Sequence, residues 1–382
     1  MSCGASLVWS VDRPKLLFFV TEDYYFVSHR LPLAQAAQAA GYDVCVVTRV
    51  RKDGEVIRRC GFRLIPFENV RSSLNPVREL RTLCRLIRVY RRERPAIVHH
   101  VAMKPVMYGT IAARLAGTPA IINAVVGMGW LFTSRGGLAR LLAPAVRWAL
   151  RRVLNAGVAL VQNPDDARLL EDFGVAPSRI RRVDGSGVDL HRFRPCPSPD
   201  NVPAVVLPAR LLWDKGVGEF IAAARLLRQR GLVARFLLAG VPDPLNPASI
   251  QLSEVEAWVR EGVIEYAGWV ADMPALLASC HVVCLPSYRE GLPKSLIEAA
   301  AAGRAIVTTD VPGCREVVRH GDNGLLVPPH DATALADAIE RVVGHKALRD
   351  EMGKRGRLRA EQRFGIDAVV RQILVLYNEA AS

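Results

Sequence analysis

Short apolar runs alternate with helical patterns along most of this chain. The first run, residues 15–20 (KLLFFV), leads through an expected loop to Ser28-His29-Arg30, after which residues 32–40 have a helical pattern that ends at Gly41. Short apolar runs are typical of buried strands, and helices between them indicate βαβ units around a parallel sheet. The further runs of this first set are residues 43–48, 62–66, 96–99, 120–124 and 158–162.

A second alternation of the same kind fills the rest of the chain. The first one stops near Gly185, and residues 191–203 (HRFRPCPSPDNVP) are dense in proline and polar residues, which indicates a linker. Apolar runs then recur at residues 204–209, 234–239, 263–267, 281–285, 305–309 and 325–327. The pattern predicts an α/β protein with two Rossmann-like, doubly wound domains, residues 1–190 and 204–365. A last amphipathic helix begins near residue 366, and the segment 366–382 is a candidate to pack back on the first domain.

Composition and charge narrow the class of protein. With 382 residues, 50% hydrophobic and 23% charged, the chain is globular and long enough for about two domains. No apolar stretch of spanning length lacks charges, the N-terminal residues do not have the pattern of a secretory signal, and the eight cysteines form no C-x-x-C pair. These features favour a cytoplasmic protein with reduced thiols.

The formal net charge of +14 predicts an anionic partner. The chain has no zinc-finger spacing, RNA-recognition motif or basic tail, so no nucleic-acid partner is expected. It also has no G-x-G-x-x-G after a first strand, no Walker A sequence and no D-x-D pair, which disfavours dinucleotide enzymes, P-loop enzymes and a metal held on a diphosphate. A membrane surface or a phosphorylated ligand remains.

Two cations follow the first strand of the second half. Arg210 and Lys215, in RLLWDKG, fall in a strand-to-helix loop at the carboxyl end of the strand, where α/β folds bind phosphate. Two fixed cations there can neutralise a leaving diphosphate, a role that a metal would otherwise fill. The alternative is a pair of ordinary solvated loop cations.

Two carboxylates flank a second turn in the same half. The stretch 286–303 (PSYREGLPKSLIEAAAAG) opens as a loop with Glu290 and closes as a helix that carries Glu298 and ends at Gly303. Free N–H groups at a helix start favour a phosphate or sugar oxygen, and Glu298 lies about two turns further on. This spacing suits a long polyhydroxyl ligand with a diphosphate in its middle. A capped surface helix with solvated glutamates is the alternative.

Together these motifs resemble glycosyltransferase family 4, retaining enzymes with the GT-B fold. The resemblance rests on RLLWDKG and EGLPKSLIE and covers nearly the whole chain. Five more segments resemble the subgroup that extends lipid-linked oligosaccharides for bacterial surface polysaccharides: FVSHRLPLAQAAQAAGYDV, HHVAMKPVMYGTIAARLAG, GVDLHRFRP, GVPDPLNPASI and TTDVPGCREVV.

The resemblance implies a role for each motif. Arg210 and Lys215 would bind the donor diphosphate, Glu290 would hold hydroxyls of the donor sugar and support charge on its anomeric centre, and Glu298 would bind the ribose. The implied donor site also includes Gly291, Leu292, Pro293, Lys294, Ser295 and Leu296, with Gly268 and Val270 beside the base. Retention without an evident nucleophile implies front-face attack, in which the leaving phosphate takes the acceptor's proton. No divalent metal or other cofactor is expected.

Two departures from the family pattern concern the first half. Residues 21–28 contain no glycine where many relatives have a glycine-rich loop, and residues 124–127 (AVVG) contain no histidine where many relatives have one. No catalytic histidine can therefore be assigned; His29, His99 and His100 are the nearest candidates, and a structural role is an equal alternative. His29, Arg30 and Lys104 are expected to hold an acceptor phosphate.

The sequence thus predicts a metal-independent retaining glycosyltransferase that moves a sugar, from a donor expected to be UDP-linked, to a lipid-diphosphate-linked glycan. The alternatives are a transferase with a soluble acceptor, a nucleotide-hexosamine epimerase, and a membrane-associated scaffold with a degenerate site. Arginines recur along expected helices in residues 77–94 and 136–154, so we expect peripheral docking on the anionic inner face of the cell membrane.

Overall fold

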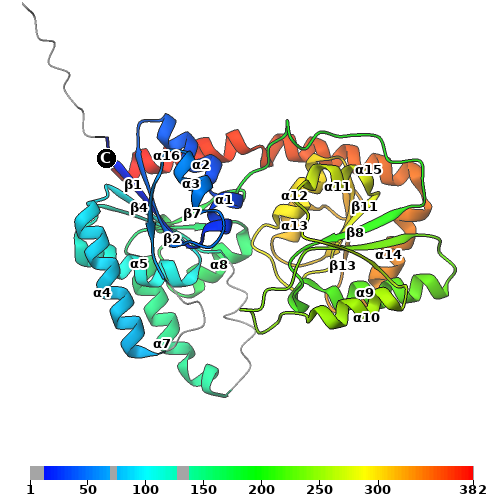
Figure 1. Cartoon of the computed structure of the whole chain (residues 1–382), viewed down its shortest axis with the longest axis horizontal. Helices are drawn as coiled ribbons and strands as arrows, with labels where there is room; N and C mark the ends of the chain where they lie inside the picture. Colours follow the sequence, from blue (N-terminus) through cyan, green and yellow to red (C-terminus); the bar gives the residue numbers. More distant parts are fainter. Residues whose placement is uncertain (1–12, 69–74, 127–136, 382) are drawn as a thin grey trace, which may run out of the picture. The chain divides into compact units, whose positions relative to one another are not determined.

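The computed structural model describes residues 13–68, 75–126 and 137–381 (Figure 1). The chain divides into two compact units. One consists of Met1–Ala124, Arg152–Ala159 and Leu374–Ser382, and the other of Val125–Arg151 and Leu160–Ile373. Gly127 and Gly136, and the N-terminal residues up to 12, lie outside the described part of the chain.

The first sheet has seven strands in the order β3-β2-β1-β4-β5-β6-β7. They are β1 Lys15–Glu22, β2 Asp43–Arg49, β3 Arg63–Pro66, β4 Ile97–Val101, β5 Ala120–Ala124, β6 Val158–Val161 and β7 Ile180–Arg182. Strand β1 pairs in parallel with β2 on one side and β4 on the other, so the strand order reverses there. This is the strand arrangement of a doubly wound fold.

The second sheet has six strands in the order β10-β9-β8-β11-β12-β13, with every neighbouring pair parallel. They are β8 Ala204–Pro208, β9 Arg235–Ala239, β10 Glu265–Gly268, β11 Val282–Leu285, β12 Ala305–Thr309 and β13 Gly324–Val327. The predicted fold class, two parallel-sheet α/β domains, is confirmed.

Helices connect the strands in both sheets. Those of the first half are α1 Asp23–His29, α2 Leu31–Ala39, α3 Gly54–Arg59, α4 Pro76–Glu93, α5 Met103–Ala116, α7 Gly137–Leu154 and α8 Pro164–Asp172. Those of the second are α9 Val217–Gln229, α10 Leu252–Arg260, α11 Met273–Ser279, α12 Lys294–Ala301, α13 Cys314–Val317, α14 Ala332–Gly344, α15 Lys346–Arg359 and α16 Ile366–Ala381.

Helices cover both faces of the second sheet (Figure 1). On one face Val205 and Leu207 of β8 belong to a core cluster with residues of α9 and α14. Ala204 and Val206 of the same strand point to the other face, into a cluster with residues of α11, α12 and α13. Both faces of the second sheet are therefore buried, which explains why its strands appear in the sequence as continuous apolar runs.

One stretch predicted as a loop is helical. Residues 23–29 form α1, with Asp23 in its first turn accepting the N–H of Tyr24 at 2.8 Å. Phe26, in the middle of this helix, is buried and packs edge-on against Phe18 of β1. The loop prediction was wrong because a helix of seven residues is too short to show a clear apolar period.

The last helix contributes side chains to the first unit. Tyr377 is fully buried, and its hydroxyl lies 2.6 Å from His99 Nδ1. Asn378 accepts a hydrogen bond of 2.9 Å from the hydroxyl of Tyr42. Residues from Leu374 onward accordingly group with the first sheet.

Candidate donor and acceptor sites

The two predicted donor motifs follow neighbouring strands of the second sheet. Arg210 is the second residue after β8, and the short 3-10 turn Trp213–Lys215 leads into α9. Residues 286–293 follow β11 and lead into α12. Because β8 and β11 are paired in parallel, their carboxyl ends meet at one edge of the sheet. The expectation that both motifs share that edge is confirmed.

An ion pair joins these two loops. Lys215 Nζ lies 2.5 Å from Glu290 Oε1, and the two side chains are only 19% and 12% exposed. The carbonyl of Asp214 accepts hydrogen bonds from the hydroxyl of Ser287 at 3.1 Å and from the N–H of Tyr288 at 3.0 Å. Both sequence-predicted charges are therefore held at fixed positions before any ligand binds.

Two glycines allow the close approach of backbone at this edge. Gly216 has φ +70°, and a Cβ there would lie 2.0 Å from the carbonyl oxygen of Pro286. Gly313 has φ +80°, and a Cβ there would lie 2.5 Å from the carbonyl oxygen of Gly291. Any other residue at either position would push the Glu290 loop away. Nothing in the segment TTDVPGCREVV predicted this role of Gly313.

Arg210 is the more accessible cation. Its side chain is 44% exposed, and Nη1 lies 2.7 Å from Oδ2 of Asp243. Sequence reasoning missed Asp243 as a partner, although it lies in the quoted segment GVPDPLNPASI. An arginine held on one side and open on the other keeps N–H donors available for a phosphate.

Glu298 lies inside α12, where it is only 9% exposed. It forms an ion pair with Lys294 one turn earlier, at 3.4 Å. Burial raises the pKa of Glu298, an effect that the charge of Lys294 partly offsets. A carboxyl group in such a place is suited to one or two directional hydrogen bonds with ligand hydroxyls.

The remaining predicted donor residues differ in how accessible their side chains are. Leu292, Pro293 and Leu296 are buried, and Leu296 packs in the core cluster, so its side chain is not available to a ligand. Gly268 ends β10 with φ +62°, and its carbonyl accepts the N–H of Gly240 at 2.8 Å. Gly291, Lys294, Ser295 and Val270 are half-buried.

No metal site emerges in the part of the chain that the structure describes. Among those residues, no three His, Cys, Asp or Glu side chains group in a way that could hold a metal ion.

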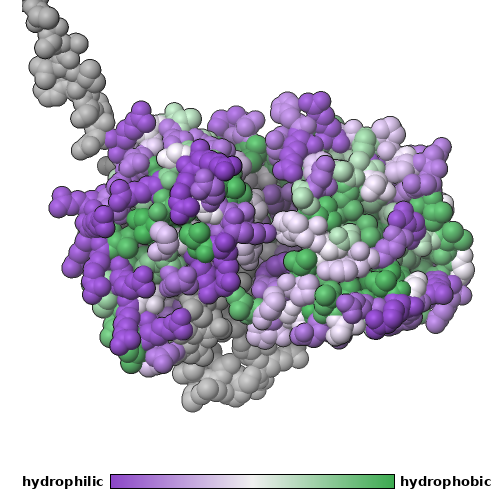
Figure 2. Space-filling view, in the orientation of Figure 1, coloured by the Kyte–Doolittle hydropathy of each residue, from purple (hydrophilic) through white to green (hydrophobic). Residues whose placement is uncertain are grey.

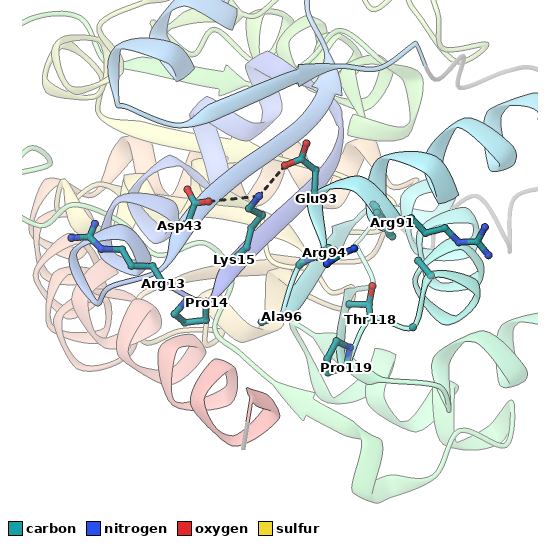
Figure 3. A pocket seen from close by; sticks show the side chains of 14 residues that line it. Arg13, Pro14, Lys15, Asp43, Arg91, Glu93, Arg94, Ala96, Thr118 and Pro119 are labelled. Carbon is teal, nitrogen blue, oxygen red and sulfur yellow. Dashed lines mark hydrogen bonds and ion pairs between the residues drawn. The ribbon is translucent and has the colours of Figure 1, made fainter. Parts of the chain in front are cut away.

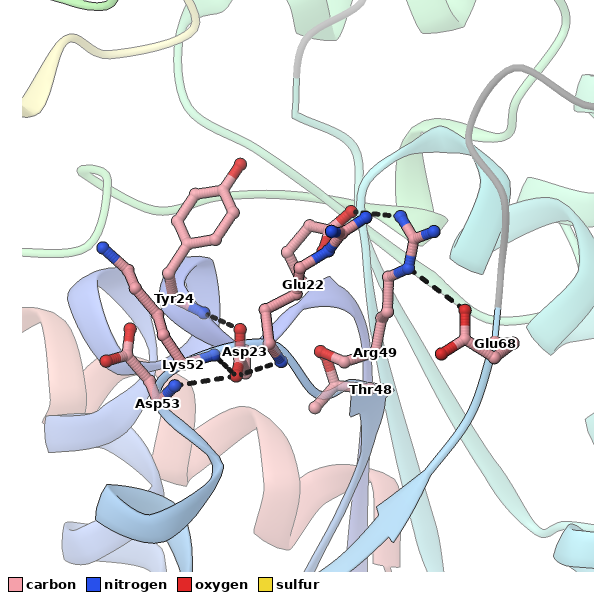
Figure 4. Close-up of polar contacts among 9 residues, drawn as sticks. Glu22, Asp23, Tyr24, Thr48, Arg49, Lys52, Asp53 and Glu68 are labelled. Carbon is pink, nitrogen blue, oxygen red and sulfur yellow. Dashed lines mark hydrogen bonds and ion pairs between the residues drawn. The ribbon is translucent and has the colours of Figure 1, made fainter. Parts of the chain in front are cut away.

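In the first unit, two acidic residues at the end of β1 organise the loop after β2 (Figure 4). Asp23 is fully buried, and its Oδ2 accepts the three successive N–H groups of residues 51–53 at 2.7, 3.0 and 2.8 Å. Glu22 Oε1 lies 3.4 Å from Arg49 Nη1, and Arg49 Nε donates to Glu68 at 3.1 Å. The carboxyl edge of this sheet is thus polar and preorganised, which the sequence analysis did not foresee.

The three predicted acceptor residues lie in different surroundings. His29 is half-buried, and its ring stacks on that of Tyr25 with the ring centroids 4.2 Å apart. Arg30 is only 4% exposed, so its guanidinium is largely out of reach of a ligand in this structure. Lys104, in the first turn of α5, lies 3.0 Å from Glu79.

The two histidines of β4 are fully buried. His99 contacts the Tyr377 hydroxyl, while His100 lies 3.1 Å from the Tyr90 hydroxyl and 2.8 Å from Asn123 Oδ1. Burial lowers the pKa of both residues, that of His100 to about 4, so both are neutral near pH 7. These contacts favour the structural role that the sequence left open.

A cavity of about 910 Å³ lies at the opposite edge of the first sheet (Figure 3). Its lining includes Lys15 and Asp43, the first residues of β1 and β2, and Pro119, just before β5. Lys15 pairs with buried Glu93 at 3.0 Å across it. Because doubly wound folds bind ligands at the carboxyl ends of their strands, this cavity is not the candidate substrate site.

Comparison with known proteins identifies the family. Residues 15–156 match a family model described as Glycosyl transferase 4-like, and residues 202–345 match one described as Glycosyl transferases group 1. Together the two matches span most of the chain. The chain belongs to glycosyltransferase family 4 and is an enzyme that transfers a sugar.

Two relatives of known name are similar to this chain over most of its length. The chain is 28% identical over 373 residues to N,N'-diacetylbacillosaminyl-diphospho-undecaprenol alpha-1,3-N-acetylgalactosaminyltransferase of Campylobacter jejuni, covering 93% of this chain and 95% of that protein. It is 24% identical to UDP-Gal:alpha-D-GlcNAc-diphosphoundecaprenol alpha-1,3-galactosyltransferase of Escherichia coli, covering 80% and 81%. The crystal structure of Anabaena HepE with UDP-glucose superposes with a TM-score of 0.77 at 18% identity, covering 96% and 99%. The predicted GT-B fold is confirmed.

The different positions of the two glutamates predict different kinetic effects. Glu298→Gln should raise the donor KM more than it lowers kcat, because this residue lies on the helix and would hold the ribose. Glu290→Gln should lower kcat by about a hundredfold with little change in KM, since its charge would matter most in the transition state. Steady-state kinetics with varied donor measures both. Glu256→Gln, an exposed change on α10, is the control; equal effects of the two variants on both constants would contradict the division of roles.

Proposed function

We propose that this enzyme transfers a sugar from a UDP-linked donor to a glycan carried on a lipid diphosphate, with retention of anomeric configuration and without a divalent metal. The observation that carries the proposal is the pair of cations, Arg210 and Lys215, at one sheet edge together with Glu290. In the two relatives named above, the acceptor is a sugar on undecaprenol diphosphate, and one of them uses UDP-galactose.

The residues at this edge suit a front-face transfer. The bond between the anomeric carbon and the diphosphate oxygen breaks, and its electron pair leaves with UDP. The acceptor hydroxyl bonds to the same face of that carbon and gives its proton to the departing phosphate oxygen. Arg210 and Lys215 stabilise the negative charge that develops on the diphosphate, and Glu290 stabilises the positive charge at the anomeric carbon.

Lys215 can bind Glu290 and the donor diphosphate at the same time. Its ammonium group has three N–H donors, and one of them suffices for the 2.5 Å contact with Glu290. The others remain for phosphate oxygens. Glu290 thereby keeps Lys215 in place, and Lys215 keeps a negative charge near the transferred sugar.

The acceptor is proposed to bind at the carboxyl edge of the first sheet. His29 is the last residue of α1, the helix that follows β1, and Lys104 lies in the first turn of α5, the helix that follows β4. Arg30 belongs to the same predicted set, but its burial makes it a weaker contributor than the other two.

A basic face on α4 supports docking on an anionic membrane. Arg78, Arg81, Arg88 and Arg92 are exposed, while Leu86 and Tyr90 on the same helix are buried in the core. On the same helix, the apolar side chains of Leu80 and Val77 are 62% and 57% exposed. Figure 2 shows hydrophilic residues over the region where α4 lies, with apolar patches between them.

This combination of arginines and exposed apolar side chains suits the surface of a bilayer. Each arginine near an anionic leaflet contributes about 1 kcal/mol, so a few suffice for peripheral binding. Within the described ranges, no helix combines the length and apolar character needed to cross a bilayer. We propose peripheral association with the cytoplasmic face of the cell membrane.

Metal independence gives the test of the catalytic proposal. Transfer from a UDP-sugar to a lipid-diphosphate-linked sugar should persist in EDTA, while Lys215→Ala should lower kcat by about a hundredfold or more, the scale of losing one preorganised charge contact. A radiolabelled-sugar assay measures both. Lys346→Ala removes a surface lysine paired with Asp350 at 2.8 Å and is the control. Loss of activity in EDTA with recovery in magnesium would contradict the proposal.

Membrane docking through α4 predicts salt-dependent binding to vesicles. The protein should float with anionic liposomes at low salt and be largely lost from them at high salt, because screening weakens exposed charges. The triple change Arg78→Glu, Arg81→Glu and Arg88→Glu should abolish flotation and leave nucleotide binding intact.

The matched control reverses three exposed arginines elsewhere in the first half of the chain, Arg58→Glu, Arg59→Glu and Arg114→Glu. Equal loss in both triple variants would mean that net charge decides, not the face of α4. Equal recovery on neutral and anionic vesicles would contradict electrostatic docking altogether.

A further inference from the structure

The loop that follows β9 packs against the loop that carries the donor cations. We call residues 240–250 (GVPDPLNPASI) the proline loop, since it contains Pro242, Pro244 and Pro247. It begins at Gly240, which has φ +150°, and a Cβ there would lie 1.8 Å from the carbonyl oxygen of Ala209. The two backbones therefore touch directly at the residue before Arg210.

Backbone hydrogen bonds from the proline loop then hold the segment after Arg210 on both sides. The N–H of Leu211 donates to the carbonyl of Val241 at 3.0 Å, and the carbonyl of Leu211 accepts from Ile250 at 2.9 Å. The N–H of Trp213 donates to the carbonyl of Ala248 at 2.9 Å. Leu211 and Leu212, just before the 3-10 turn, thus lie between the two arms of the proline loop and form isolated β-bridges with Pro242 and Ser249.

Asp243 sits at the turn of this loop with its own backbone fixed. Its N–H donates to the hydroxyl of Ser249 at 3.0 Å, and its carbonyl accepts from the N–H of Asn246 at 2.8 Å. Its carboxylate is only 14% exposed and lies 2.7 Å from Arg210 Nη1. A carboxylate held this firmly fixes the direction of the arginine that it binds.

We propose that Asp243 is a positioning residue that presents Arg210 to the leaving diphosphate. An exposed arginine on a flexible stem loses rotamer freedom when it grips a phosphate, and that cost opposes binding. Asp243 removes most of that freedom in advance while it occupies one nitrogen of the guanidinium. The inference rests on the proposed function, because it takes Arg210 as a diphosphate ligand.

Two other roles for Asp243 predict different effects of its removal. If the carboxylate only competed with the diphosphate for Arg210, its removal would tighten the binding of UDP. If it only stabilised the proline loop, its removal would harm the enzyme whether or not Arg210 is present. If Asp243 acts by positioning Arg210, removing Asp243 should weaken UDP binding and activity only while Arg210 is present.

A double-mutant cycle separates these possibilities. The variants are Asp243→Asn, Arg210→Gln and the combination, with Asp243→Glu as the conservative variant. The measurements are the Kd of UDP by calorimetry, kcat and KM for the UDP-sugar, and the melting temperature. Glu261→Gln is the matched control, because Glu261 pairs with Arg225 at 2.6 Å on the surface of the same unit.

Asp243→Asn should weaken UDP binding a few-fold and lower kcat/KM by about tenfold, the scale of losing one charge-assisted partner. The same change should have almost no further effect in the Arg210→Gln background, Asp243→Glu should restore part of the activity, and the control should match the wild type.

Tighter UDP binding by Asp243→Asn would overturn the proposal in favour of competition. Additive losses, together with a lowered melting temperature, would overturn it in favour of a loop-stabilising role. A wild-type protein that binds no UDP would instead contradict the proposed function, and with it the premise for Arg210.

Discussion

The ion pair between Lys215 and Glu290 is the interaction on which the donor site depends. Each residue is mostly buried, and a buried charge without a partner would cost far more than the pair does. The pair forms only because β8 and β11 are neighbours in a parallel sheet, so that the loops after them meet. In the mechanism that we propose, it places a cation for the diphosphate and an anion for the anomeric carbon in direct contact with each other. The chemistry that we propose needs both charges at that spacing.

The surrounding backbone protects this geometry from both directions. Gly216 and Gly313 let neighbouring chain segments approach the Glu290 loop closely, and the proline loop fixes the segment that carries Arg210. The enzyme therefore holds its donor charges ready before the substrate arrives, as expected when catalysis relies on electrostatics and positioning more than on a side-chain base. The buried, neutral His99 and His100 fit the same view, because neither is placed to exchange a proton with a substrate.

Much of the fold and of the donor site could be predicted from the sequence. Buried parallel strands appear in the sequence as continuous apolar runs. Because the segments that follow such strands meet at one edge of the sheet, the sequence predicted that Arg210, Lys215, Glu290 and Glu298 lie near one another. Pairings between distant segments could not be predicted in this way. Asp243 is an ordinary loop aspartate until the fold brings it to Arg210, and the sequence does not reveal that Arg30 is only 4% exposed. The predicted limits of the two domains, and the roles predicted for the donor and acceptor residues, remain predictions.

The stereochemistry of the product tests the central claim most directly. A UDP-linked donor with an α-configured sugar, a lipid-diphosphate-linked acceptor and the enzyme in EDTA would be incubated, and the anomeric configuration of the new linkage determined by NMR. Front-face transfer assisted by Arg210, Lys215 and Glu290 predicts an α-linked product. A β-linked product would contradict the account, because inversion requires attack from the face of the anomeric carbon opposite to the leaving diphosphate.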